Sequence, residues 1–367
     1  MQSEGFDFAM ATPDDLGAVC ATMLHFAENP IVIAAFSCKF ACGVLAIVMF
    51  AILFVVKASS AHWITPRKLT LHPNACTLVY AHFVFVFIGT LGVLFNDGFD
   101  LFRLTIFRTA VAEDSGANSC GIFAMPATFG APMRLLTLFG NTGSTLSMSA
   151  IAIERTIATL RAKSYESVRS RRIGYTLLLS ALVVDIAAML YVVSFINWGR
   201  SLPMQSLTVE AADPATYVMF GCGVIEIFNI AGLVALWCKN LKWKRTANRI
   251  AASLSQKYQV EENIQTTSML IPLTALHCVL NLIAYVLMVV GIWKAPNMQQ
   301  KLEAVITRDV APVYDLLLPT FTLIRMAWKK RKETVSRTKP IAPGDGRHFE
   351  LLNGMFEKAL DKHISNN

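Results

Sequence analysis

Seven apolar stretches constrain the fold of this chain more than any other feature of its sequence. Each has about 20 residues or more, the length that a helix needs to cross about 30 Å of hydrocarbon. They cover Ile31–Val56, Ala75–Phe95, Ala124–Ile153, Ile173–Ile196, Tyr217–Trp237, Thr266–Trp293 and Asp309–Trp328. Of the 367 residues, 54% are hydrophobic and 16% are charged, a composition typical of membrane proteins. The sequence therefore predicts an all-α membrane protein, a bundle of seven transmembrane helices embedded in the lipid bilayer.

Lys and Arg residues are divided unequally between the two sides of the predicted bundle. Twenty of them lie in the connections and helix ends on one side, against six on the other side. Loops rich in Lys and Arg stay on the cytoplasmic side, so the N-terminus is expected outside and the C-terminus inside. Because this rule already explains the net charge of +8, we expect no nucleic-acid partner.

This orientation divides the chain into three regions. Residues 1–30 form an extracellular tail, residues 31–328 form the bundle, and residues 329–367 form a cytoplasmic tail. Within the last region, apolar residues recur at helical spacing from Phe349 to Leu360. This pattern predicts an amphipathic helix that lies either on the inner leaflet or a partner, or on the protein itself.

The third predicted helix contains many small and hydroxyl residues between Thr142 and Ser149. Such residues allow neighbouring helices to approach closely and to hydrogen-bond to one another, so this helix is expected at the centre of the bundle. It ends in the pair Glu154 and Arg155, which is followed by a basic segment. An acid and an Arg at the inner end of a central helix suggest a receptor switch.

Two motifs resemble those of nematode serpentine chemoreceptors of the alpha-type superfamily, in particular the alpha-beta class. They are IAIERTIAT with the following Tyr165 and Glu166, and LSQKYQVEENI from Leu254 to Ile264. The resemblance implies a G-protein-coupled receptor in the plasma membrane of sensory neurons, which detects an environmental chemical and activates a heterotrimeric G protein. It also implies a coupling surface formed by Glu154, Arg155, Tyr165, Glu166 and Tyr258.

In the larger rhodopsin-like class, a Cys just outside the third helix forms a disulfide with the second outer loop. Cys120 occupies the corresponding position, but the segment from Trp198 to Thr216 contains no Cys. Cys222 is the first candidate partner, Cys20 is the second, and a free Cys120 is the alternative. Rhodopsin-like motifs of the second, sixth and seventh helices are absent, so their switch residues are not transferred.

Five ionisable residues lie inside the apolar stretches, where such groups are costly unless they are paired or face a cavity. They are Lys39, Arg134, Asp185, Glu226 and Asp315. Their positions along the helices place them in the outer half of the membrane. We predict a ligand site there between the third, fifth, sixth and seventh helices, formed by Arg134, Glu226 and Asp315 with Leu138, Phe228 and Tyr314. The five charges sum to −1, which favours a neutral or weakly cationic ligand, whereas internal salt bridges are the structural alternative.

Other classes of function find less support. The eight Cys residues include no CxxC motif, and His82 and His277 lack an HExxH partner, so neither an enzyme nor a bound metal or cofactor is expected. A seven-helix transporter or channel is the main alternative to a receptor. A transporter would favour paired repeats and two helices broken by Gly or Pro, which the sequence does not show.

Overall fold

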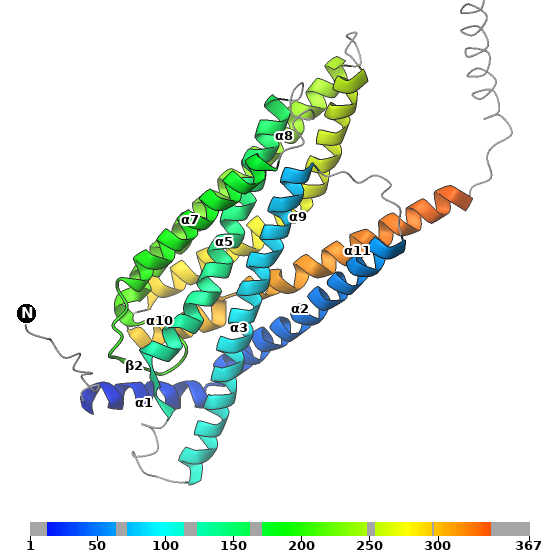
Figure 1. Ribbon diagram of the computed structural model, residues 1–367. Helices are drawn as coiled ribbons and strands as arrows, with labels where there is room; N and C mark the ends of the chain where they lie inside the picture. Colours follow the sequence, from blue (N-terminus) through cyan, green and yellow to red (C-terminus); the bar gives the residue numbers. More distant parts are fainter. Residues whose placement is uncertain are drawn as a thin grey trace, which may run out of the picture. The chain divides into compact units, whose positions relative to one another are not determined.

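Helices form nearly all of the described chain in the computed structural model (Figure 1). The structure describes residues 13–63, 72–113, 123–161, 171–247, 254–295 and 297–338. The long helices are α2 (Pro30–Trp63), α3 (Pro73–Glu113), α5 (Ala127–Leu160), α7 (Arg172–Val193), α8 (Val209–Ala247), α9 (Leu254–Lys294) and α11 (Ala311–Thr338). Two shorter helices are α1 (Pro13–Glu28) and α10 (Met298–Arg308), and two short strands, β1 (Met125–Pro126) and β2 (Ser201–Leu202), pair antiparallel. Each long helix overlaps one predicted span, which confirms the predicted fold class.

Six stretches in the described helices are long and apolar enough to cross a membrane. They lie in α2, α3, α7, α8 and α9, and from α10 into α11. Helix α5 falls short of this criterion because hydroxyl residues and Asn141 dilute its apolar character. A helix with this composition needs other helices around it, since lipid cannot satisfy its polar groups.

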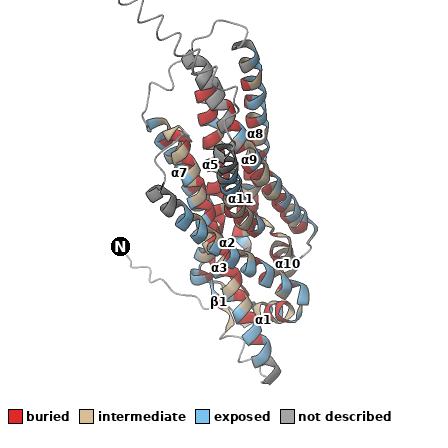
Figure 2. Ribbon diagram, turned by 90° about the vertical axis from the view of Figure 1, so that its right-hand side faces the viewer, coloured by how far each residue is buried: buried red, intermediate tan, exposed pale blue. Residues whose placement is uncertain are grey.

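Helix α5 is surrounded by other helices, as predicted. It contacts α3, α7, α8 and α9, and Figure 2 shows buried residues on the helices around it. Its small and hydroxyl residues from Thr142 to Thr145 are all buried. The polar composition that distinguishes α5 from the other long helices is therefore explained by its central position.

Glycines bring α3 and α5 close together. A Cβ atom at Gly140 would overlap the backbone of Gly89 and would lie 2.9 Å from the carbonyl oxygen of Phe85. A Cβ atom at Gly92 would lie 2.7 Å from the backbone nitrogen of Thr137. Small residues at such a contact allow two helix backbones to approach within van der Waals distance. We refer to Gly89, Gly92 and Gly140 as the glycine contact.

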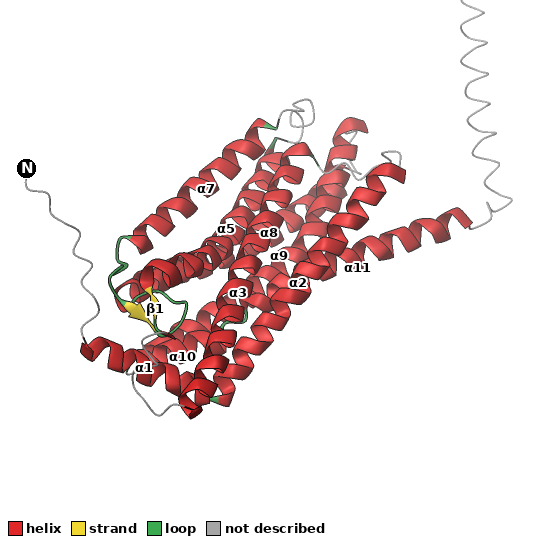
Figure 3. Ribbon diagram, turned by 60° about the horizontal axis from the view of Figure 1, so that its bottom comes forward, coloured by secondary structure: helices red, strands yellow, loops and turns green. Residues whose placement is uncertain are grey.

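An apolar cluster covers one end of the helices, where α1, α10 and the strand pair gather (Figure 3). We call this cluster the cap and this end the α1 end. Phe26 of α1, Phe36 of α2, Leu104 of α3, Met204 after β2 and Ile306 of α10 are all buried in it. Asn29 donates a hydrogen bond to Glu303 Oε1 at 3.1 Å, and His25 lies 3.4 Å from Glu303 Oε2. The α1 helix was not predicted within the tail of residues 1–30.

Helix α3 extends to Glu113, although the predicted span ended at Phe95. In the sequence, Asp97, Asp100 and Arg103 resemble a solvated loop. In the structure these side chains are buried and paired: Lys39 Nζ lies 2.8 Å from Asp97, and Arg103 lies 3.0 Å from Asp100. Paired charges are tolerated in a membrane helix, so the helix continues through them.

Asp100 and Arg103 also hold the segment between β2 and α8. The backbone N–H of Gln205 donates to Asp100 Oδ2 at 2.8 Å, and Arg103 donates to the carbonyl oxygens of Phe123 and Pro203. The connection between α7 and α8 is therefore fixed to α3 by one hydrogen bond that Asp100 accepts and one that Arg103 donates.

The chain divides into two compact units, Met1–Pro319 and Thr320–Asn367. The first unit contains every contact discussed below. The second unit is described only as the continuation of α11 to Thr338. The amphipathic helix predicted for the tail lies outside the described residues.

Candidate functional site

Two histidines and a tyrosine from three helices meet beside the middle of α5. His82 of α3 places Nδ1 2.9 Å from Ser147 Oγ and Nε2 2.7 Å from the hydroxyl of Tyr314 on α11. His277 of α9 places Nε2 3.1 Å from Ser144 Oγ. The His277 and Tyr314 rings pack edge to face with their centroids 4.6 Å apart, and the two His rings are 5.3 Å apart. We call these five residues the central network, and Tyr314, Ser144, Ser147 and both histidines are buried in it.

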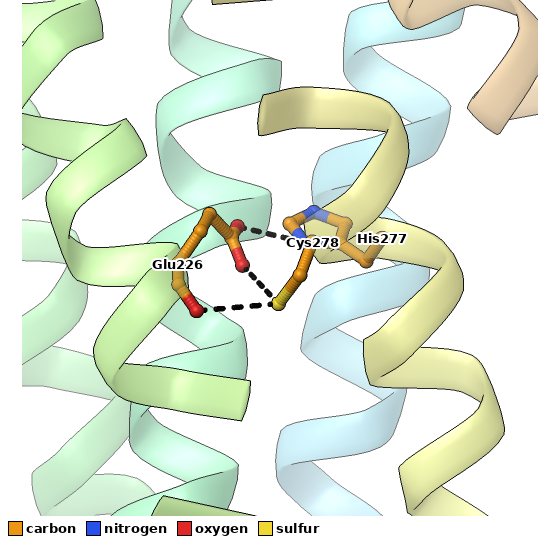
Figure 4. A group of neighbouring side chains, drawn as sticks. All are labelled: Glu226, His277 and Cys278. Atoms are coloured by element: carbon orange, nitrogen blue, oxygen red, sulfur yellow. Dashed lines mark hydrogen bonds and ion pairs between the residues drawn. The ribbon is translucent and has the colours of Figure 1, made fainter. Parts of the chain in front are cut away.

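Glu226 of α8 extends this network to a fifth helix (Figure 4). Its Oε1 lies 2.7 Å from His277 Nδ1, and Cys278 Sγ donates to its Oε2 at 2.8 Å. Glu226 and His277 are completely buried, and Cys278 is 4% exposed. A carboxylate, an imidazole and a thiol therefore point toward one another between α8 and α9.

The structure brings Glu226 and Tyr314 together, but through His277 rather than by direct contact. Asp315 is buried next to Tyr314 in the chain, and its Oδ2 has no hydrogen-bond partner among the described residues. Arg134 is half-buried, and no described residue forms an ion pair with it. The alternative in which Arg134 is locked to Asp315 is therefore not found.

Two residues of the predicted ligand site lie away from the central network. Leu138 is buried, but it packs with Val192 of α7 and Ala215 of α8 in an apolar cluster. Phe228 is 72% exposed, so the prediction that it lines an internal site is wrong. The reason is helical geometry: Phe228 lies two residues after Glu226, which turns its side chain about 200° away from that buried carboxylate at about 100° per residue.

The remaining charges of the predicted set have partners of different kinds. Lys39 pairs with Asp97 toward the α1 end of α3, so its charge no longer contributes to the predicted ligand site. Asp185 of α7 accepts a hydrogen bond from the Thr142 hydroxyl, while its Oδ2 has no partner among the described residues. Without Lys39, the set contains three acids and Arg134, and it is more acidic than predicted.

Glu154 and Arg155 form a two-point ion pair at the far end of α5. Arg155 Nε lies 2.5 Å from Glu154 Oε2, and Arg155 Nη2 lies 2.6 Å from Glu154 Oε1. Both residues are buried, with exposed fractions of 0% and 2%. The acid and the Arg at this end of α5 therefore pair with each other.

The positions of the other predicted coupling residues are described in part or not at all. Tyr165 and Glu166 lie outside the described residues, and Tyr258 lies in the first turns of α9, where only the backbone is described. Close to the ion pair, Asn240 of α8 donates to Thr159 of α5 at 3.4 Å, and both residues are buried. Sequence reasoning missed this contact between α5 and α8.

The cysteines contradict the predicted pair of Cys120 and Cys222. Cys222 is a free, buried thiol, whereas Cys20 is disulfide-bonded. Cys120 lies outside the described residues. The remaining free cysteines in the described part of the chain are Cys38, Cys42, Cys76, Cys238 and Cys278. The first candidate partner is wrong because Cys222 faces Tyr285 and Met288 inside the helix bundle.

Sequence reasoning also missed the roles of His82, His277 and Cys278. Their partners lie on other helices, and no short motif in the sequence joins them. A signal that could find them is depth, because polar residues at similar heights on different helices can converge beside a central helix that is rich in hydroxyl groups.

Comparison with known proteins identifies the family. Residues 18–353 match the profile of the serpentine type 7TM GPCR receptor class ab chemoreceptors. The serpentine receptor class alpha/beta-14 of Caenorhabditis elegans is 32% identical over 139 residues, which are 36% of this chain and 35% of that protein. The serpentine receptor class beta-16 of the same nematode is 26% identical over 208 residues, 52% of this chain and 57% of that protein.

The chain thus aligns with about a third of one relative and somewhat more than half of the other. The family profile, in contrast, covers the chain from α1 into the C-terminal tail. It agrees with the seven long helices and with the predicted resemblance. This protein belongs to the serpentine class ab chemoreceptors, a family of seven-transmembrane G-protein-coupled receptors.

Proposed function

We propose that this receptor binds a small neutral or weakly cationic environmental chemical beside the central network and activates a heterotrimeric G protein. The membrane of sensory neurons is the proposed location. The ligand would lie toward the α1 end, which is the predicted outer half, with Glu226, Tyr314 and Asp315 as its polar contacts. Arg134 is proposed to border the site on α5.

The charges of the described residues support this class of ligand. Asp185 and Asp315 are buried, and no described Lys or Arg forms an ion pair with either of them, whereas Glu226 contacts His277. Buried acids without a fixed cation attract positive charge or hydrogen-bond donors and repel anions. An anionic ligand would therefore have to overcome both desolvation and repulsion.

One observation carries the proposed coupling: α5 bears the central network and the Glu154–Arg155 pair on one continuous helix. Ser147 and Glu154 are seven residues apart, about 10 Å along the helix axis at 1.5 Å per residue. A shift of α5 at the network would therefore reach the ion pair through a rigid element. Tyr165, Glu166 and Tyr258 are expected to contact the G protein at the same end.

The experiment begins with cells that express the full-length receptor. Calcium imaging against a broad chemical panel identifies an agonist, and variants then locate its site. We expect Asp315→Asn and Tyr314→Phe to raise the half-maximal agonist concentration about tenfold or more, since a hydrogen bond to a charged group contributes about 1.5–3 kcal/mol.

Phe228→Leu is the matched control, because Phe228 is an aromatic residue of α8 on the exposed surface. It should leave agonist potency unchanged. Unchanged potency in both Asp315→Asn and Tyr314→Phe, at normal surface levels, would contradict the proposed ligand site.

A further inference from the structure

The group formed by Glu226, His277 and Cys278 has the composition of a transition-metal site. One ligand atom from each residue lies within 4.8 Å of the other two. Carboxylate oxygen, imidazole nitrogen and thiolate sulfur are the three donor types that bind Zn²⁺ in proteins. We propose that these residues bind a divalent metal ion of the Zn²⁺ class and thereby join α8 to α9.

The spacing of the donors fits an ion with small adjustments. Zinc bonds of about 2.0–2.3 Å in tetrahedral geometry place neighbouring donors about 3.4–3.6 Å apart. In the structure, His277 Nδ1 lies 2.7 Å from Glu226 Oε1, and Cys278 Sγ lies 2.8 Å from Glu226 Oε2. A bound ion would require these two pairs of atoms to separate by less than about 1 Å, while the His277 and Cys278 donors already lie within 4.8 Å of each other.

Glu226 and His277 already form a close pair inside the bundle. Oε1 and Nδ1 lie 2.7 Å apart, and both residues are completely buried. A metal ion would replace this contact with two coordinate bonds, one to the carboxylate oxygen and one to the imidazole nitrogen.

The charge of the site balances when the ion is bound. Zn²⁺ has two positive charges, while the Glu226 carboxylate and the Cys278 thiolate have one negative charge each. The His277 imidazole binds in its neutral form, and the thiol proton passes to solvent when the thiolate coordinates. The completed site is thus neutral, which matters because a net charge within the membrane is expensive.

His277 also has the outer contacts that metal-bound histidines need. Coordination through Nδ1 leaves the proton on Nε2, which lies 3.1 Å from Ser144 Oγ and 2.9 Å from the side-chain amide of Asn281. Ser144 Oγ or, after rotation of its amide, Asn281 Oδ1 can accept that proton. Such a second contact fixes the imidazole orientation and strengthens metal binding. Three protein ligands leave a fourth position for water.

The test uses the full-length receptor purified in detergent with a peptide tag that contains no histidines. Metal content is measured by mass spectrometry without chelators. Chelator-treated receptor is then titrated with Co²⁺ alone, whose bond to a thiolate gives a charge-transfer absorption band. We expect one metal ion per receptor and a saturable band for the wild type.

Two variants assign the band to this site. Cys278→Ser should remove the band and weaken Co²⁺ binding at least about 100-fold, since even outer contacts of metal ligands are worth 10–100-fold. Cys222→Ser is the matched control, because Cys222 is a buried free thiol one helical turn before Glu226 on α8. This control should keep both the band and the metal.

If Cys278→Ser fails to fold, Glu226→Gln replaces it, because it keeps the side-chain size and removes the charged ligand. Thermal unfolding of each chelator-treated variant establishes whether it is folded. A wild-type receptor without a saturable thiolate band would overturn the proposal. The same metal content in the wild type, a folded Cys278→Ser variant and Cys222→Ser would also overturn it.

Discussion

The glycine contact between α3 and α5 predicts a large difference between two substitutions of the same kind. In Gly140→Ala, the added methyl group meets the Gly89 backbone and the carbonyl oxygen of Phe85, neither of which can rotate away. In Gly232→Ala on α8, no atom lies within 4 Å of the added group. The two variants differ only in what the methyl group contacts.

The magnitudes follow from two opposing effects. Inserting a methyl group into a packed interface typically costs about 1–3 kcal/mol, and contact with the α3 backbone at two residues places Gly140 at the upper end. Replacing Gly by Ala inside a helix gains up to about 1 kcal/mol from the helix propensity of Ala. The free energy of unfolding should therefore fall by about 2 kcal/mol in Gly140→Ala and should stay equal or rise in Gly232→Ala.

Thermal unfolding of the purified receptor in detergent measures both effects, and surface labelling in cells provides a second readout. We expect Gly140→Ala to melt below the wild type and to reach the surface less efficiently, with Gly232→Ala at or above the wild type in both assays. Equal melting temperatures for the two variants would show that α3 and α5 can separate at low cost, and the packing argument would be refuted.

Three further predictions concern buried charge pairs and the tail. Arg155→Ala should abolish G-protein activation and lower the surface level, because the buried Glu154 carboxylate loses the guanidinium that it pairs with, and breaking a buried ion pair costs about 3–5 kcal/mol; adding Glu154→Gln should restore the surface level but not the signal, and recovery of both would contradict the assigned role. Lys39→Met should destabilise the receptor by a similar amount through Asp97, and Asp97→Asn should rescue it in thermal unfolding; a stable single variant would argue against the pair. Truncation at Pro340 should preserve surface delivery, whereas intracellular retention would show that the tail packs on the bundle or carries a trafficking contact.

The sequence predicted those parts of the fold that depend on the membrane alone. Apolar length located the helices, and the hydroxyl residues of α5 placed this helix in the centre because lipid cannot satisfy them. The far end of α3 was missed because Asp97 and Asp100 are tolerable only with Lys39 and Arg103 beside them. Those pairings are properties of the folded structure, so no local pattern reveals them.

The same distinction applies to the candidate site. Glu226 and Tyr314 are buried, as expected for residues that face the inside of the bundle. The exposed position of Phe228 could not be predicted, because the sequence does not show which face of α8 packs against the other helices. His277 connects the two chosen residues, but a single His in an apolar helix gives no indication of its neighbours. The Cys222 prediction failed for a related reason, since the depth of a thiol below the surface depends on the tilt and length of its helix.

The cap affects the route by which a ligand can reach the proposed site. Helices α1 and α10 and the segment around Met204 pack over the α1 end with apolar side chains, so a ligand approaching from that side meets folded protein. We expect association from water to be slow and limited by the opening of these helices. A lipophilic ligand can instead partition into the bilayer and enter between helices, so potency across a chemical series should follow membrane solubility as well as shape.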